Sequence, residues 1–142
     1  IVLSVLGEGM PLIYNGQEAG NPKRLAFFER DPIDWRGHRI GDLYTDLIAL
    51  KKAHSALHNG QWGARMIPVT NSHPDKVFSF MRQDKASKVI VMLNLSGEQL
   101  PLSLTSSAVF GPVEDWHTGE RIELTNKCEF NLAPWQWLIF TA

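Results

Sequence analysis

The sequence has a single cysteine, no long apolar run and almost no net charge. Cys128 alone cannot form an internal disulfide or a multi-cysteine metal site. No stretch has the length of a membrane span, and no signal peptide can be identified. A formal net charge of −1 gives no electrostatic reason to expect nucleic acid or anionic lipid. We therefore predict no nucleic-acid partner and no membrane partner, while the localisation stays open.

Several catalytic and cofactor signatures are also absent. There is no Gly-x-Ser-x-Gly nucleophile elbow and no Gly-Lys-Ser/Thr phosphate loop. Gly7-Glu8-Gly9 is not a dinucleotide fingerprint, because Leu12 replaces the third glycine and the apolar strand follows the glycines. His54 and His58 lie four apart on an expected helix, but no third ligand is evident. We predict no metal site and no cofactor in this chain.

The apolar pattern changes near Asn59-Gly60. Before this point, leucines from Leu43 to Leu57 recur at spacings of three and four, which predicts a helix of about four turns. After it, short apolar segments alternate with turn residues, which predicts an antiparallel sandwich. The expected strands are Gln61 to Val69, Val77 to Arg82, Lys88 to Asn94, Gln99 to Leu104, Ala108 to Val113, Arg121 to Leu124, Cys128 to Asn131 and Trp135 to Thr141. Pro68 and Pro101 are expected at strand ends or edges, since proline cannot donate to an inner ladder.

Residues before the helix are expected to contain one more strand. Ile1 to Leu6 is interpreted as a helix end stopped by Gly7 or Gly9. Met10 to Tyr14 lacks polar alternation, which predicts a parallel strand covered on both faces. Residues 15–39 are rich in Gly, Pro, Asp, Asn and Arg and are expected to form a long loop. The chain opens on Ile1 and not on Met, and we expect it to be a piece of a longer polypeptide.

Several segments in the same order resemble the α-amylase family of glycoside hydrolases (glycoside hydrolase family 13). Residues 9–18 resemble the family's eighth barrel strand through Gly9, Pro11, Leu12, Ile13, Tyr14, Gly16 and Glu18. Residues 49–57 resemble the eighth barrel helix. The segments that resemble the C-terminal β domain are 77–82, 89–96, 115–119, 132–135 and 139–140.

This resemblance implies the fold and the function. Residues 1–59 are expected to be the last β/α unit of a (β/α)₈ TIM barrel. Residues 60–142 are expected to be a C-terminal antiparallel β sandwich of about eight strands, of Greek-key type, so the chain is mainly β. The parent is expected to hydrolyse or transfer α-linked glucosyl units of starch or maltooligosaccharides. Its catalytic carboxylates are expected upstream of Ile1, as are the family's usual calcium-binding segments, so this fragment alone is expected to be inactive.

Two alternatives stay open. In the first alternative, the chain is a non-catalytic carbohydrate-binding module. In the second, it is a non-catalytic amylase-like protein that uses the fold for interactions with other proteins. In each case a strand at Met10 to Tyr14 has no partner within the chain. We expect this segment to pair with another copy, to pack atypically on the sandwich, or to be ordered by the rest of a barrel.

The candidate site residues lie in the long loop. Gln17 and Glu18 directly follow the expected barrel strand, on the face where barrel enzymes carry out their chemistry. Arg24, Arg30 and Trp35 are expected at a cleft rim, since aromatic faces stack on sugars and charged groups bind hydroxyls. The alternatives are that Glu18 holds loops together through hydrogen bonds and that the loop aromatics fix the loop to the barrel.

The tryptophans of the β region form a second group of candidates. Trp116 and Trp135 are candidates for stacking on a sugar ring. Trp135 and Trp137 are expected to share one face of a strand, because side chains alternate with a period of two. The alternative is that these rings fill the core or cover the junction between sandwich and barrel.

Overall fold

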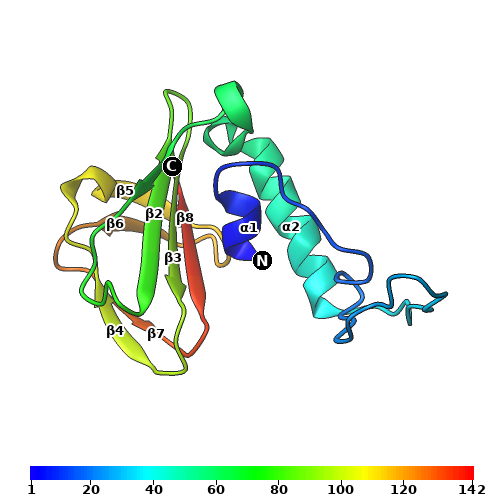
Figure 1. Cartoon of the computed structure of the whole chain (residues 1–142). Coiled ribbons are helices and arrows are strands. Elements are labelled where there is room, and N and C mark those ends of the chain that lie inside the picture. Colours follow the sequence, from blue (N-terminus) through cyan, green and yellow to red (C-terminus); the bar gives the residue numbers. More distant parts are fainter.

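The computed structural model describes all 142 residues as helices packed on one face of a β sandwich (Figure 1). The larger sheet has six strands in the order β1-β2-β3-β8-β5-β6, all antiparallel, and the smaller sheet pairs β4 with β7. The expected mainly β class with eight strands is confirmed. The bounds are β1 Met66–Pro68, β2 Val77–Gln83, β3 Lys88–Asn94, β4 Leu100–Ser103, β5 Gly111–Asp115, β6 Arg121–Leu124, β7 Glu129–Leu132 and β8 Trp137–Thr141.

Two α-helices and three short 3₁₀ helices complete the fold. Helix α1 (Val2–Leu6) lies between the large sheet and α2 (Arg39–Ala53), as Figure 1 shows. The 3₁₀ helices are η1 (Ser55–Leu57), η2 (Gly60–Trp62) and η3 (Ser107–Val109). The helix expected from the leucine spacing is therefore present, although it ends at Ala53 and is followed by η1.

The central strands of the large sheet are buried on both faces, which explains their nearly continuous apolar sequence. On β2, Val77 and Met81 contribute to the core between the two sheets. The alternate residues Phe78 and Phe80 face α1 and α2 instead. The second core joins residues from both sides of position 59: Val2, Val5, Leu6, Tyr44, Leu47, Leu50, Leu57, Phe80, Val89, Val91, Leu93 and Ile139.

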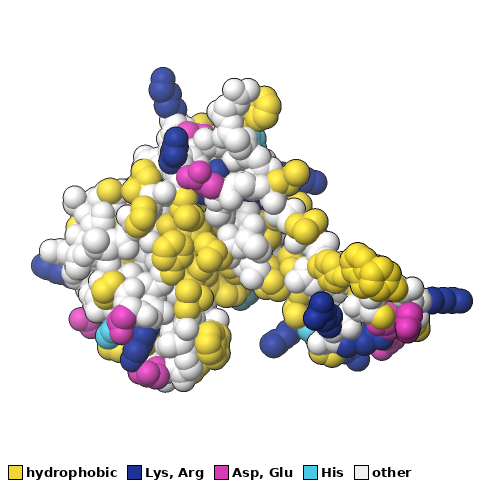
Figure 2. All heavy atoms as spheres, viewed as in Figure 1, with side chains coloured by type: hydrophobic (Ala, Val, Ile, Leu, Met, Phe, Trp, Pro, Cys, Tyr) yellow, Lys and Arg dark blue, Asp and Glu magenta, His cyan; other side chains and the backbone are white.

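The strand expected at Met10 to Tyr14 is absent, and that prediction was wrong for this chain. The segment has no ladder partner, and Met10 and Leu12 are 83% and 82% exposed. A strand needs a neighbour for its backbone N–H and C=O groups, and this chain offers none beside the segment. Residues 15–38 then form the expected long loop, which extends away from the rest of the chain (Figures 1 and 2).

Two further expectations need correction. The expected strand from Trp135 begins only at Trp137, because Trp135 occupies a turn with φ of 60°. Trp135 and Trp137 therefore do not share a strand face. The expected strand from Gln61 is reduced to β1, since η2 occupies its first residues. Pro68 ends the edge strand β1, and Pro101 lies in β4, which pairs with β7 alone, so both prolines avoid an inner ladder as expected.

Candidate functional site

Gln17 and Glu18 lie in a tight turn over residues 15–20 that precedes the long loop. The Gln17 side chain closes this turn, because its Oε1 accepts a hydrogen bond from Tyr14 N at 2.7 Å. The Gln17 N–H donates back to Tyr14 O at 2.9 Å. This amide is therefore occupied in holding the turn.

The turn docks on the N-terminus of α2. Gly20 has φ of +67°, and a Cβ placed there would lie 2.7 Å from the ring of His38. His38 is the N-cap of α2, and its Nδ1 accepts a hydrogen bond from Ile40 N at 3.2 Å. A glycine is required at this position both for its backbone conformation and for the close approach of the imidazole.

Glu18 has a carboxylate oxygen without a hydrogen-bond partner. Its Oε2 is buried, and no donor of the chain reaches it. Burial raises the pKa of Tyr44, and the negative charge of Glu18 raises that pKa further. Glu18 therefore lies near the buried phenol of Tyr44, with one acceptor left free.

The other candidates of the loop are exposed. Arg24, Arg30 and Trp35 point into solvent, and no hydrogen bond of the structure joins them to Gln17 or Glu18. Arg24 lines a hollow of about 550 Å³ together with Tyr14, Leu25, Ala26 and Phe27. The loop is stabilised by hydrogen bonds and an ion pair between its own residues, and not by contacts to the sandwich.

An internal ion pair organises this loop. Asp31 accepts hydrogen bonds from Lys23 and from the backbone N–H of Ala26. The Lys23 ammonium lowers the pKa of Asp31. Phe27 and Phe28 pack edge to face at 4.8 Å, yet they are 89% and 94% exposed. Figure 2 shows apolar side chains beside basic and acidic groups on the projecting loop.

Trp116 and Trp135 lie in different turns. Trp116 follows β5, is half-buried, and packs on Trp137 with ring centroids 6.0 Å apart. Trp135 precedes β8 and is 67% exposed, with its backbone N–H bonded to Ser96 O at 3.1 Å. The structure does not combine the two rings into one platform.

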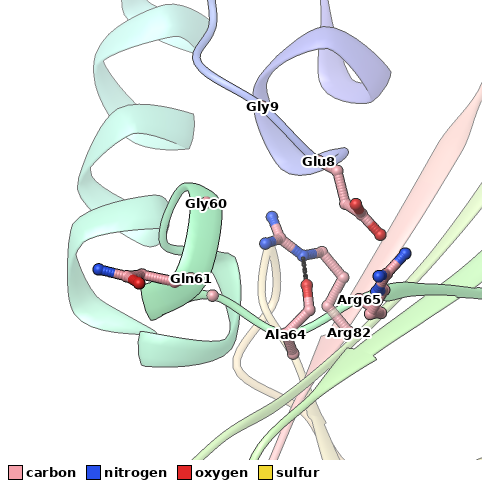
Figure 3. Close-up of a pocket in the computed structure, with 8 residues that line it drawn as sticks. Glu8, Gly9, Gly60, Gln61, Ala64, Arg65 and Arg82 are labelled. Atoms are coloured by element: carbon pink, nitrogen blue, oxygen red, sulfur yellow. Dashed lines mark hydrogen bonds between the residues drawn. The ribbon is translucent and has the colours of Figure 1, made fainter.

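A buried arginine that the sequence reasoning did not single out lies between the sandwich and the helical segment (Figure 3). Arg82 is 1% exposed. Its guanidinium donates to five backbone carbonyls, those of Leu6, Gly7, Leu57, His58 and Ala64. The signal was present in the sequence, since a charged residue continues the apolar face of Phe78 and Phe80.

The Arg82 cavity, of about 510 Å³, lies beside this guanidinium. Glu8 and Arg65 line the cavity and point toward one another in Figure 3. Burial lowers the pKa of Arg82, and the charge of Glu8 opposes this shift. A buried cation that donates to five backbone carbonyls joins the chain segments that carry them.

The histidines form no metal cluster. No group of three His, Cys, Asp or Glu side chains is arranged to hold a metal ion. His54 and His58 were expected four apart on one helix. His54 is instead the C-cap of α2 with an extended backbone, so the two histidines do not share a helix face. Burial lowers the pKa of His54. No helix in the structure combines the length and apolar character needed to cross a membrane.

The chain is similar to several α-amylases in sequence or in fold. No family model matches the chain. Alpha-amylase 2 of Dictyoglomus thermophilum is 26% identical over an alignment of 103 residues, which covers 63% of this chain and 17% of the relative. The maltogenic α-amylase AmyB of Thermotoga neapolitana superimposes with a TM-score of 0.78 and 19% identity, covering 99% of this chain and 34% of AmyB.

A second solved α-amylase gives the same fold match. The enzyme of Geobacillus thermoleovorans, complexed with acarbose, has a TM-score of 0.72 at 15% identity and covers 99% of this chain. The match spans 31% of that enzyme, so this chain corresponds to about a third or less of each of these relatives.

Proposed function

Since the resemblance to the C-terminal part of α-amylases is confirmed in sequence and in fold, we propose that this chain is part of a glycosidase that acts on α-glucans such as starch and maltooligosaccharides. Residues 1–59 would complete the barrel of that enzyme, and residues 60–142 would be its C-terminal β sandwich. The match of 99% of this chain to AmyB, across both segments, is the observation that carries this proposal.

The exposed apolar segment supports a role as part of a larger fold. Met10, Leu12 and Tyr14 are 83%, 82% and 58% exposed, although their sequence is that of a buried strand. Large apolar side chains that are exposed together stabilise a fold when another part of the protein covers them. We infer that the rest of the barrel covers it by pairing with residues 10–14, in preference to a second copy of the chain.

The chain is proposed to be inactive by itself. A retaining glycosidase needs two carboxyl groups about 5 to 5.5 Å apart across the scissile bond. Glu18 is the sharpest candidate of the loop, and no hydrogen bond or common cavity joins it to Glu8 or Glu29. The reactive carboxylates, and any calcium ion, are accordingly assigned to the part of the enzyme that precedes Ile1.

Gln17, Glu18, Arg24, Arg30 and Trp35 are proposed as cleft-rim residues. The free oxygen of Glu18 supports this role for the carboxylate, because a buried acceptor gains when a donor reaches it. The donor would come from a substrate hydroxyl or from a residue of the upstream barrel. Arg24 and Arg30 form no ion pair in this chain, so their guanidinium groups remain available to hydroxyl groups of a substrate.

The test is to extend the coding sequence upstream in frame to its start codon and to compare the extended protein with the 142-residue chain. Release of reducing ends from amylose is expected from the extended protein and not from the chain alone. Retention of the α-anomer in the product, measured by NMR, is expected as well. Activity of the chain alone would contradict the proposal, and an inactive extended protein would identify a non-catalytic relative.

A matched pair of variants tests the cleft rim. In the extended protein, Glu18→Gln is expected to lower kcat/KM about tenfold, since it removes a charged hydrogen-bond acceptor. Glu29→Gln changes an exposed carboxylate of the same loop and is expected to leave kcat/KM unchanged. Equal effects of the two substitutions would remove Glu18 from the cleft rim.

A further inference from the structure

A second cavity lies away from the long loop, between α2 and the turn after β5. It has a volume of about 470 Å³ and is named here the Trp116 groove. Helix α2 contributes residues spaced by three and four, which share one helix face. The groove is lined by Asp46, Ala49, Leu50, Ala53, His54, Trp116 and His117.

The aromatic wall of this groove is held rigidly. The Trp116 N–H donates to Ile139 O at 2.9 Å, which fixes the backbone next to β8. Its ring lies 6.0 Å from that of Trp137 at an angle of 40°, and Trp137 meets the His117 ring edge-on at 6.0 Å. A ring that is already immobilised loses little conformational freedom when a ligand stacks on it.

Hydrogen bonds also fix the turn that carries the aromatic wall. Asp115 Oδ1 accepts from His117 N at 2.8 Å and from Thr118 N at 2.9 Å. The turn is therefore closed by its own aspartate, as in an Asx turn. The backbone of His117, which lines the groove, is therefore fixed before any ligand arrives.

Polar groups line the groove together with the aromatic wall. Asp46 is exposed on α2 and forms no ion pair in the structure. His54 is half-buried at the end of the helix, and His117 is exposed. The small side chains of Ala49 and Ala53 leave the space between them open. The groove thus combines one aromatic ring with several hydrogen-bonding groups around an open space. Such a site suits a ligand ring that has an apolar face and polar groups at its edge.

From this geometry we propose that the Trp116 groove binds a short neutral oligosaccharide, with one pyranose ring stacked on Trp116 and hydroxyl groups bonded to Asp46 and His54. The carboxylate of Asp46 disfavours an anionic ligand, and the volume lies in the range of small-molecule sites. The choice of an α-glucan as the oligosaccharide rests on the proposed function. Asp46 is the only carboxylate that lines the groove and a glycosidase needs two, so the site holds the oligosaccharide without cleaving it.

The experiment uses the 142-residue chain and maltotetraose. Isothermal titration is expected to show saturable binding, and the indole N–H resonance of Trp116 is expected to shift in NMR spectra. Asp46→Ala and Trp116→Ala are each expected to weaken binding about tenfold or more. Trp62→Ala removes an exposed tryptophan outside the groove and is the matched control, expected to keep the affinity.

A second variant guards against loss of the fold, because Trp116 also packs on Trp137. Ala53→Leu fills the groove from an exposed helix position and is expected to abolish binding while the thermal unfolding temperature is retained. Absence of saturable binding, or loss of binding in Trp62→Ala with retention in Trp116→Ala, would overturn the proposal. Equal affinity for cellotetraose would overturn the assignment to α-glucans. None of these outcomes depends on turnover, so they are independent of the assay for hydrolysis.

Discussion

Lys51 and Arg82 donate hydrogen bonds to the same acceptor, the backbone carbonyl of Leu57. The Lys51 Nζ lies 2.7 Å from this oxygen, and the Arg82 Nη1 lies 3.1 Å from it. Both side chains are buried, at 8% and 1% exposure, and neither forms an ion pair. The two cations thus connect the end of the helical segment to the sheet through backbone dipoles.

This shared carbonyl predicts large and coupled effects on stability. Arg82→Met removes one donor from each of five carbonyls, of which only that of Leu57 keeps Lys51, and is expected to lower the free energy of unfolding by about 3 kcal/mol. Lys51→Met is expected to cost about 1 to 2 kcal/mol. The double variant is expected to deviate from the sum, because each single variant still leaves Leu57 one donor. Denaturant unfolding monitored by tryptophan fluorescence measures all three values.

The control for Arg82 is Arg65→Met, which changes an exposed arginine of the same cavity. Its free energy of unfolding is expected to stay within about 0.5 kcal/mol of the parent chain. A similar loss in Arg65→Met and Arg82→Met would show that the carbonyl contacts are not the cause.

His54 predicts a pH dependence of folding. Its pKa is lowered by burial in the folded chain, so below the ordinary value of 6.5 the unfolded state binds more protons than the folded state. Stability is therefore expected to fall as the pH drops from about 6.5 toward the folded-state pKa, and to become constant again below that value. Urea unfolding across this range measures the slope.

The variant His54→Gln is expected to reduce that slope, since it removes the half-buried imidazole whose pKa is lowered. His58→Gln removes an exposed imidazole of the same segment and serves as the matched control. An identical pH profile for His54→Gln and the parent chain would refute the assignment.

The pair of Glu18 and Tyr44 predicts a change in a tyrosine titration. Burial is the larger cause of the raised pKa of Tyr44, and the charge of Glu18 is the smaller one. Glu18→Gln is therefore expected to lower the Tyr44 pKa only part of the way toward its ordinary value. The chain has two tyrosines, so Tyr44→Phe assigns the tyrosinate absorbance signal without ambiguity. An unchanged titration would mean that the carboxylate and the phenol are farther apart than in this structure.

The backbone of Trp135 predicts that glycine is more stable than alanine at this position. Its φ of 60° is unfavourable for residues with a Cβ, at a cost of about 1 to 2 kcal/mol. Trp135→Gly is expected to be more stable than Trp135→Ala by about 1 kcal/mol in denaturant unfolding. At Trp62, which lies in η2, the order is expected to be reversed, because glycine lowers the stability of a helical turn. The same order at both positions would exclude backbone strain at Trp135.

The sequence by itself determined the elements whose signal is local. The apolar residues of β2 and β3 and the leucine spacing of α2 predict these elements, because each forms from residues that are neighbours in the chain. The long loop that starts at Asn15 was likewise expected from its content of Gly, Pro, Asp, Asn and Arg. The resemblance to α-amylases also depended on these short segments in their order.

The tertiary structure alone decided which distant residues meet. Met10 to Tyr14 has the sequence of a buried strand, yet it stays unpaired because hydrogen-bond partners for a strand come from outside the segment. The five carbonyls around Arg82 and the groove beside Trp116 combine residues that are far apart in the chain. Local pattern carries no information on such meetings, since they depend on how helices and sheets pack.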